Sequence, residues 1–209
     1  MSHSNIEALG VNAEQRLGFG AHGADAQPLS PEEIAQFSAG PNNPSIGQWE
    51  AAIENASRIT GINPNVIAGM IWAESRGNPD IDPSHNHDGS YDIGLMQISQ
   101  GRWQRDVLPK LTTEQRAEIK TLTGKDPSQL NMNNPADNII GGACELNLWV
   151  QKYNGDLAQG LRGYNTGEVN PGNLRDTGGI GSPAYVDNVM AYAQELMMGK
   201  KLSEDPHGK

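Results

Sequence analysis

Residues 69–79 read GMIWAESRGNP, and this stretch sets a single carboxylate, Glu74, on the apolar face of a helix. The Asn-Pro pair at 63–64 starts that helix, because Asn caps a helix and Pro fits its first turn. Ile67 and Met70 lie seven and four residues before Glu74, so the carboxyl group shares their buried stripe. Burial removes water from a carboxyl group and raises its pKa, which keeps it protonated near neutral pH. Glu74 is therefore a candidate general acid.

The position of Glu74 also permits a structural interpretation. A Glu one turn before the end of a helix can turn outward into solvent and pair with a neighbouring cation such as Arg76. Position in the helix does not separate the two interpretations, so the choice depends on the rest of the chain.

Apolar residues recur every three to four positions along most of the chain between residues 45 and 198, which indicates helices. No β-branched alternation is long enough for a substantial sheet, and the turn-rich stretch 80–92 predicts a surface loop or a short hairpin. The predicted fold class is mainly α with at most a small β-hairpin. Helices are predicted at 45–59, 64–76, 112–122, 134–150, 156–164 and 184–198.

The two ends of the chain differ from this helical region. Residues 1–44 are polar and rich in Gly, Ala, Asn, Ser and Pro, which predicts a flexible N-terminal arm. Within the arm, a Ser-Pro-Glu-Glu sequence combines an N-cap, a first-turn Pro and an acidic third position, so a short helix is predicted over 31–38. Residues 45–200 form the predicted folded domain, and 201–209 a C-terminal tail.

Charge and composition exclude several partners. The 209-residue chain has a formal net charge of −10, whereas a nucleic-acid binder needs cations to neutralise phosphates, so no nucleic-acid partner is expected. No stretch approaches the roughly 18 apolar residues of a membrane-spanning helix, so no membrane insertion is expected. Cys144 is the one cysteine of the sequence, which excludes an intramolecular disulfide, and its apolar helical surroundings predict a small buried side chain.

The sequence predicts no metal and no cofactor. The stretch 80–91 has Asp and Ser at odd positions, as a calcium loop does, but His85 stands at the required Gly and Tyr91 at the final Glu. His85 and His87 alternate in this loop without a larger cluster of ligands, which is typical of solvated loop residues.

Three tryptophans are candidates for contact with a sugar ring. Trp72 and Trp149 lie on helical faces and are predicted to belong to the core. Trp103 follows a Gly in a less regular segment, so it is the favoured stacking candidate.

Five segments occur in an order that decides the interpretation of Glu74. GMIWAESRGNP (69–79) is followed by DGSYDIGLMQIS (88–99), NPADNIIGGA (134–143), GYNTG (163–167) and YVDNV (185–189). The set resembles the catalytic domain of the soluble lytic transglycosylase family, which is related to goose-type lysozymes. The resemblance covers the domain over roughly residues 45–198 and implies a lysozyme-like helical fold.

The resemblance assigns roles to residues of the first two segments. Glu74 matches the catalytic acid/base, and Ser75 is expected to orient its carboxyl group or the N-acetyl group of the sugar. The main chain of Met96 and the side chain of Gln97 are expected near the substrate, on the floor of a cleft.

The later segments supply the opposite wall. Tyr164 and Asn165 are expected to approach Glu74, with the Tyr164 hydroxyl within hydrogen-bond reach of its carboxylate. Tyr185 is a weaker candidate for lining the same site.

The reaction that the resemblance implies needs one acid. Protonated Glu74 donates to the β-1,4 linkage oxygen between N-acetylmuramic acid and N-acetylglucosamine in peptidoglycan, and the muramic N-acetyl group stabilises the developing positive charge. The Glu74 carboxylate then removes the proton of the muramic C6 hydroxyl, which attacks C1 and gives a 1,6-anhydro product.

Two alternatives stay open at this point. A hydrolytic muramidase needs a second carboxylate to position water, and Asp88 and Asp92 are the candidates, although both also suit turn caps. Goose-type lysozymes carry an acid directly after the GLMQ block, where this chain has Ser99, and that difference favours transglycosylation. The other alternative is a non-catalytic component of a secretion apparatus or virion.

Location and partners are inferred from the same features. Peptidoglycan glycan strands are the expected partner, so the expected place of action is the periplasm or cell wall. Residues 1–10 have neither the basic start nor the apolar stretch of a Sec signal peptide. Block 88–99 is similar to that of specialised transglycosylases of secretion systems, so delivery by a non-Sec route, type III-like, or in a virion is expected. The N-terminal arm is then a candidate docking segment for the secretion machine or virion.

Overall fold

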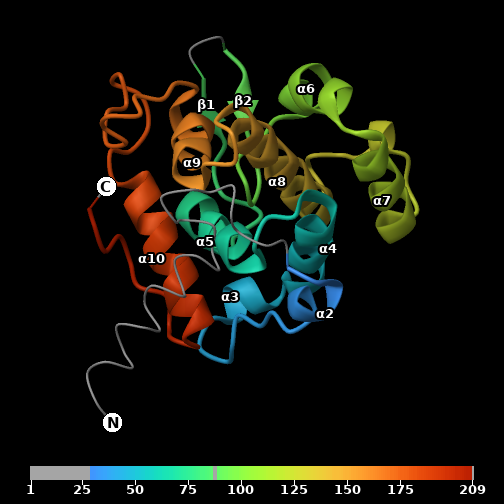
Figure 1. Ribbon diagram of the computed structural model, residues 1–209, viewed down its shortest axis with the longest axis horizontal. Helices are drawn as coiled ribbons and strands as arrows, with labels where there is room; N and C mark the ends of the chain where they lie inside the picture. The colour runs from blue at the N-terminus through green and yellow to red at the C-terminus, as the bar shows by residue number, and fades with distance from the viewer. Residues whose placement is uncertain (1–28, 87–88, 209) are drawn as a thin grey trace.

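The helix that carries Glu74, α5 (Pro64–Ser75), lies in the middle of the molecule and packs along α10 (Tyr185–Met197) (Figure 1). The computed structural model describes residues 29–86 and 89–208. Over these residues the protein is mainly α, which confirms the predicted fold class. The other elements are α2 (Pro31–Ile34), α3 (Pro44–Gly47), α4 (Glu50–Thr60), α6 (Gln100–Arg102), α7 (Thr113–Thr123), α8 (Pro135–Lys152), α9 (Leu157–Thr166), the short helical turns η2 (Trp103–Val107), η3 (Leu108–Lys110) and η4 (Pro127–Gln129), and the strands β1 (Ser84–His85) and β2 (Tyr91–Asp92).

Local sequence signals set the ends of the central helices. Gly61 ends α4 with a left-handed φ of 76°, and the Asn63 side chain then caps α5 by accepting from the backbone N–H of Asn65. The left-handed residue that ends α5 is Arg76, at φ 54°, where the sequence predicted an end near Gly77. The predicted helix 45–59 is divided into α3 and α4 just before Glu50, next to Trp49, whose indole donates to the Gly77 carbonyl.

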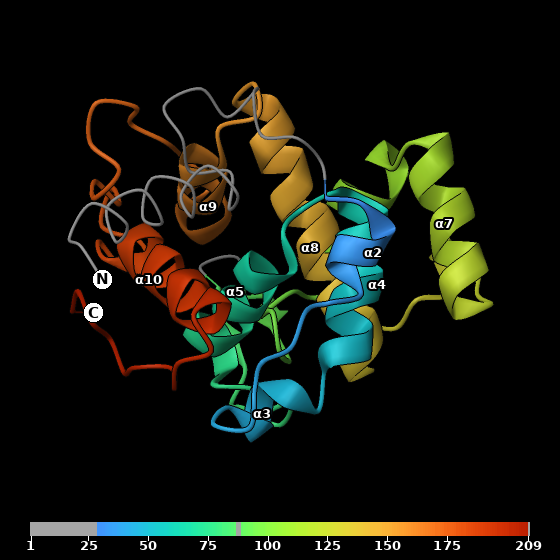
Figure 2. The same ribbon diagram turned by 60° about the horizontal axis from the view of Figure 1, so that its bottom comes forward.

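Helices α5 and α10 approach each other closely, and Figure 2 shows them crossing in contact. A Cβ atom on Gly69 of α5 would lie 3.1 Å from the Val189 carbonyl oxygen of α10, so a larger residue would push the helices apart. This close contact matters for the site, because α5 carries Glu74 and α10 begins with Tyr185.

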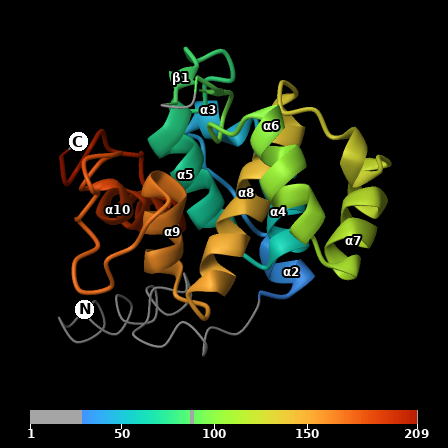
Figure 3. The same cartoon turned by 90° about the horizontal axis from the view of Figure 1, so that it is seen from above.

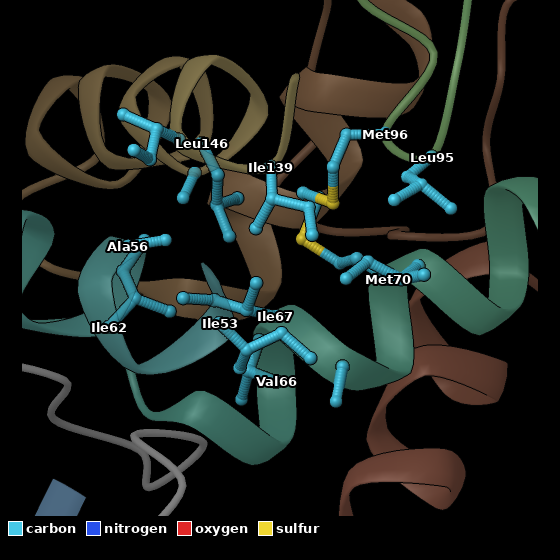
Figure 4. Close-up of a cluster of buried hydrophobic side chains, with 14 of the residues drawn as sticks. Ile53, Ala56, Ile62, Val66, Ile67, Met70, Leu95, Met96, Ile139 and Leu146 are labelled. Carbon is cyan, nitrogen blue, oxygen red and sulfur yellow. The ribbon is translucent and has the colours of Figure 1, made fainter. Parts of the chain in front are cut away.

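Helix α8 packs against α4 on one side and α9 on the other, and Figure 3 shows α8 and α9 side by side. Side chains from α4, α5, α8 and the loop before α6 meet in one core, including the fully buried Ile53, Ile67, Met70, Met96 and Ile139 (Figure 4). Burial of each side chain of this size contributes about 1.5–3 kcal/mol, so this core fixes the base of the site.

The small sheet is one antiparallel hairpin. Strands β1 and β2 pair with Ser84 opposite Asp92 and His85 opposite Tyr91, as the turn-rich stretch allowed. After β2 the chain forms a tight turn over Gly94–Gln97 and then the α6, η2 and η3 turns, which the sequence did not predict as regular structure.

Two expectations about the chain ends were wrong for the described residues. Phe37 and Ala39, assigned to the flexible arm, are buried at 7% and 1% exposure and belong to the core; the short helix α2 forms but ends at Ile34. Leu202, assigned to the tail, is buried as well. Both segments look polar in sequence, because only a few of their residues are apolar. Those few residues nevertheless anchor the segments to the core. Residues 1–28 lie outside the described residues.

In the ranges 29–86 and 89–208 every helix is too short or too polar to cross a membrane.

Candidate active site

A cleft of about 880 Å³ opens between the hairpin, helix α8, the end of α9 and the loop that leads to α10. Glu74 lines it from α5, and Gln97 lines it from the turn that follows the hairpin. Helix α8 lines it with one face, whose residues Glu145, Leu148, Trp149 and Lys152 are spaced three or four apart.

Glu74 is partly exposed on the last turn of α5, at the cleft surface, so it does not turn away into bulk solvent. The Tyr185 hydroxyl donates to Glu74 Oε1 at 2.6 Å. Burial raises the pKa of Glu74 to about 7, and the carboxylates of Asp92 and Glu145 act in the same direction, while the Tyr185 hydrogen bond and the Arg102 cation oppose them. A carboxyl group in this state holds a proton near neutral pH and releases it readily.

The prediction that Tyr164 is the hydrogen-bond partner of Glu74 was wrong. The Tyr164 hydroxyl donates to the Met96 carbonyl oxygen at 2.5 Å, and the hydrogen bond to Glu74 comes from Tyr185, the candidate that the sequence ranked lower. Burial raises the pKa of Tyr164 and of Tyr185 well above the usual range of a phenol, so both stay neutral donors. Tyr164 lines the cleft, and its hydrogen bond to Met96 also holds the turn over Gly94–Gln97 in place.

Ser75 is also placed differently from expectation. Its side chain is buried, and its hydroxyl lies 3.0 Å from the carbonyl oxygens of both Ile71 and Leu95. Ser75 therefore joins the end of α5 to the GLMQ turn, and no hydrogen bond links it to the Glu74 carboxyl group in the described residues.

The turn over Gly94–Gln97 is held by one buried amide. Asn138, on α8, accepts from the Met96 backbone N–H at 2.8 Å and donates to the carbonyl oxygens of Ile93 and Met132, both at 2.9 Å. Gly94 needs to be glycine, because its φ is 72° and a Cβ would lie 2.7 Å from the Asn138 amide nitrogen.

Within this turn, the two residues predicted to lie near the substrate, Met96 and Gln97, differ in their exposure to the cleft. Gln97 has a left-handed φ of 49° and lines the cleft, where its side chain accepts from the Ser84 hydroxyl and donates to the Gly94 carbonyl. Met96 is fully buried, and its carbonyl oxygen is taken by Tyr164, so Met96 supports the cleft from below.

A three-residue charge cluster lies beside Glu74. Arg102 donates to Asp92 Oδ2 at 3.0 Å and pairs with Glu145 Oε1 at 3.4 Å, and all three residues line the cleft. Glu145 is 8% exposed, and burial raises its pKa to about 7, with Arg102 opposing. Asp92 was predicted from the sequence and Glu145 was not, although a charged residue inside the apolar run GGACELNLWV is a usable signal. Asp88, the other candidate second carboxylate, lies outside the described residues.

The far wall of the cleft depends on a buried arginine. Arg162 donates to the Asn165 side-chain oxygen at 2.5 Å and to the carbonyl oxygens of Leu174 and Ser182. Asn165 also accepts from the Ser182 backbone N–H at 3.1 Å. The predicted site residue Asn165 therefore lines the cleft while fixing the loop that precedes α10.

Trp72 packs against the core as predicted, but the predictions for Trp103 and Trp149 were reversed. Trp103 is completely buried in the core, whereas Trp149 lines the cleft, with the Lys152 ammonium 4.6 Å from its ring centre. Trp149 follows Glu145 by one turn, so the same face of α8 presents both residues to the cleft.

The described residues contain no group of three or more His, Cys, Asp or Glu side chains arranged to hold a metal ion. Cys144 is buried and unpaired, and burial raises the pKa of its thiol to about 12, which makes it a poor nucleophile.

Comparison with known proteins gives the family. The profile of the Transglycosylase SLT domain family matches residues 51–179, more than half of the chain, and the protein belongs to this family. Two proteins named endo-type membrane-bound lytic murein transglycosylase A, from Salmonella paratyphi B and Salmonella paratyphi A, are each 31% identical to it over 111 residues. Each alignment covers 53% of this chain and 46% of the relative, so the chain matches about half the length of these relatives.

Proposed function

We propose that the protein is a peptidoglycan lytic transglycosylase that cleaves the β-1,4 bond between N-acetylmuramic acid and N-acetylglucosamine, with Glu74 as its single general acid/base. The observation that carries this proposal is a carboxyl group with a pKa of about 7 at the surface of a cleft, in a domain of the Transglycosylase SLT family. The names of the two Salmonella relatives agree with the same activity.

The geometry suggests which carboxyl oxygen carries the proton. Because the Tyr185 hydroxyl donates to Oε1, the proton of the neutral acid belongs on Oε2. Oε2 then donates to the linkage oxygen as the bond from that oxygen to C1 of the muramic residue breaks. Tyr185 stabilises the carboxylate that remains, because its hydrogen bond favours the charged form.

The second half of the reaction uses the same carboxylate as a base. The muramic N-acetyl oxygen stabilises the positive charge at C1, in the manner of substrate-assisted glycosidases. Oε2 takes the proton from the C6 hydroxyl, and the C6 oxygen forms the new bond to C1. Glu74 ends the cycle protonated, no water is consumed, and the products are a 1,6-anhydromuramic end and a free N-acetylglucosamine hydroxyl.

Hydrolysis is kept as a second candidate because Asp92 lies in the cleft near Glu74. One oxygen of Asp92 accepts from Arg102 and from Asn86, and the other, Oδ1, has no hydrogen-bond partner among the described residues. That oxygen is buried, so it would need to become accessible before a water bound to it could serve as the nucleophile of an inverting mechanism. Arg102 pairs with the first of these oxygens at 3.0 Å, and this ion pair holds the carboxylate in a structural contact, which favours the first candidate.

The test is digestion of purified peptidoglycan by the wild type, Glu74→Gln and Asp92→Asn, with muropeptides read by mass spectrometry. We expect anhydro ends from the wild type, a loss of roughly 10²–10⁴-fold or more in Glu74→Gln, and slower formation of the same anhydro ends by Asp92→Asn. Reducing ends that disappear in Asp92→Asn would establish the hydrolytic candidate. No products from a folded wild type would favour a structural or partner-activated role in a secretion apparatus or virion.

The place of action belongs to this proposal. We propose action in the periplasm or cell wall, with residues 1–28 as a docking segment for a secretion-machine or virion partner. Deletion of these residues is the test, and it stops at residue 28 because Ile34 and Phe37 are buried. Unchanged targeting with unchanged activity would remove the docking role.

A further inference from the structure

The residues that follow the last helix, α10, also contact the folded domain. Residues 199–208, here termed the C-terminal strap, turn back beside α10 (Figure 2). The strap runs antiparallel to the helix. The Ser203 backbone N–H donates to the Glu195 carboxylate at 3.0 Å, the Asp205 carboxylate accepts from the Tyr192 hydroxyl at 3.4 Å, and the His207 backbone N–H donates to the Asn188 side-chain oxygen.

The same strap holds the last turn of α5 on both sides of Glu74. Two residues before Glu74, the Trp72 indole donates to the Ser203 carbonyl oxygen at 2.8 Å. Two residues after it, the Arg76 guanidinium donates to Asp205 at 2.6 Å, and Glu204 lies 3.4 Å from the same guanidinium. Glu74 therefore lies between the two points at which the strap is attached to its helix.

Arg76 is an unusual end for this helix. Its φ of 54° is a left-handed conformation that favours glycine. Adopting this conformation costs a residue with a long side chain on the order of 1 kcal/mol. Its backbone N–H and its guanidinium both donate to the Trp72 carbonyl oxygen, and its guanidinium lies 5.3 Å from the Trp72 ring centre and 5.8 Å from that of Tyr192. The side chain thus caps α5 and links it to α10, and Asp205 holds it there.

The strap has its own anchors in the core. Leu202 is 4% exposed, and the Asn43 side chain accepts from the Leu202 backbone N–H and donates to the Lys200 carbonyl, both at 2.8 Å. These contacts make the strap a fixed support for the two helices that it joins, since a loose chain end would transmit no constraint.

The two helices joined by the strap carry the two members of one hydrogen bond, Glu74 on α5 and Tyr185 on α10. Last turns of helices fray unless they are held, and a displacement of about 1 Å of a reacting group costs up to roughly 10²-fold in rate. We propose that Asp205, with Arg76 and Trp72, is a positioning residue of the enzyme: the strap sets the last turn of α5 against α10 and so fixes Glu74 on Tyr185. This inference rests on the proposed function for its activity readout only.

The activity test is a double-mutant cycle of Asp205→Asn and Tyr185→Phe, with Asp187→Asn as the matched control. Asp187 is a carboxylate of α10 that pairs with Arg175 at the surface. We expect Asp205→Asn to lower kcat about 10-fold with KM unchanged, and to cause no further loss in the Tyr185→Phe background, because the bond it supports is already absent. Asp205→Glu is expected to recover part of kcat. Independent, additive losses, or an effect no larger than that of Asp187→Asn, would overturn the proposal.

A second readout needs no activity. The pKa of Glu74 is measured by carbon NMR titration of the labelled carboxyl group in the wild type, Asp205→Asn and Trp72→Phe, after thermal melts show that each is folded. Losing the Tyr185 hydrogen bond raises this pKa, whereas removing the Asp205 charge or admitting water would lower it. A rise in both variants supports the positioning role, and no change or a fall refutes it. An inactive wild type with the expected titrations would refute the proposed function alone.

Discussion

The raised pKa of Glu74 has a consequence for stability that the Glu74→Gln variant isolates. The pKa is about 7 in the folded protein and 4.5 for an ordinary Glu, so the folded state binds the proton more tightly than the unfolded chain does. The stability linked to this proton is fully present below pH 4.5 and is lost as the pH rises through 7. Gln is a neutral side chain of the same shape and does not titrate.

The size of the effect follows from the two pKa values. At 1.36 kcal/mol for each tenfold change in proton affinity, ionising Glu74 in the folded protein costs about 3 kcal/mol above pH 7. Relative to the wild type, Glu74→Gln should therefore gain up to about 3 kcal/mol in unfolding free energy as the pH rises from below 4.5 to above 7. Glu145 also has a pKa of about 7 but is present in both proteins, so the difference between them reports chiefly Glu74.

The assay is urea denaturation of both proteins across this pH range, with Glu54→Gln, at a partly exposed position of α4, as a control for loss of a Glu side chain. The difference between wild type and Glu74→Gln should grow with pH by more than the difference between wild type and the control. A pH-independent difference, or a Gln variant that loses stability relative to the wild type at high pH, would refute the assignment of a protonated Glu74 in the folded state.

Three further predictions follow from single contacts. Tyr185→Phe should lower kcat and move the alkaline limb of the pH–rate profile to higher pH, because it removes a hydrogen bond that holds the pKa of Glu74 down; an unmoved limb would contradict this. Asn138→Ala should cost about 2–4 kcal/mol in urea denaturation, since it leaves buried backbone groups without partners; a loss below about 1 kcal/mol would contradict the triple contact. Cys144 should react with a thiol reagent only as fast as the protein unfolds, and rapid labelling of the native state would contradict its burial.

The sequence predicted the helical framework because its signals are local. The Asn-Pro pairs at 63–64 and 134–135 start α5 and α8, and Gly61 ends α4 with a left-handed φ. Such caps involve residues only a few positions apart, so they can be read without knowledge of the fold.

The contacts within the site were harder to predict because they depend on how helices pack. Tyr164 and Tyr185 lie on different helices, and only the close approach of α10 to α5 at Gly69 brings Tyr185, in place of Tyr164, to Glu74. Glu145 is likewise joined to the site by Arg102, which is distant in sequence, and no periodic pattern indicates such a pair.

The burial errors have a different cause. Trp103 was favoured for the cleft because its sequence surroundings are irregular, but η2 turns it completely inward. Residues 34–39 were assigned to the flexible arm, and the part of the strap from residue 201 onward to a tail, because their apolar residues are few. Sequence composition averages over a segment, whereas a single residue such as Leu202 or Phe37 is enough to fix it to the core.

The measurement that tests the central claim most directly is the digestion of peptidoglycan by the wild type in water enriched in heavy oxygen. If Glu74 acts alone as acid and base, the new muramic ends are 1,6-anhydro, lighter than hydrolysis products by one water, and carry no heavy oxygen. Reducing ends that carry the label would show that water is the nucleophile and would contradict the single-acid account.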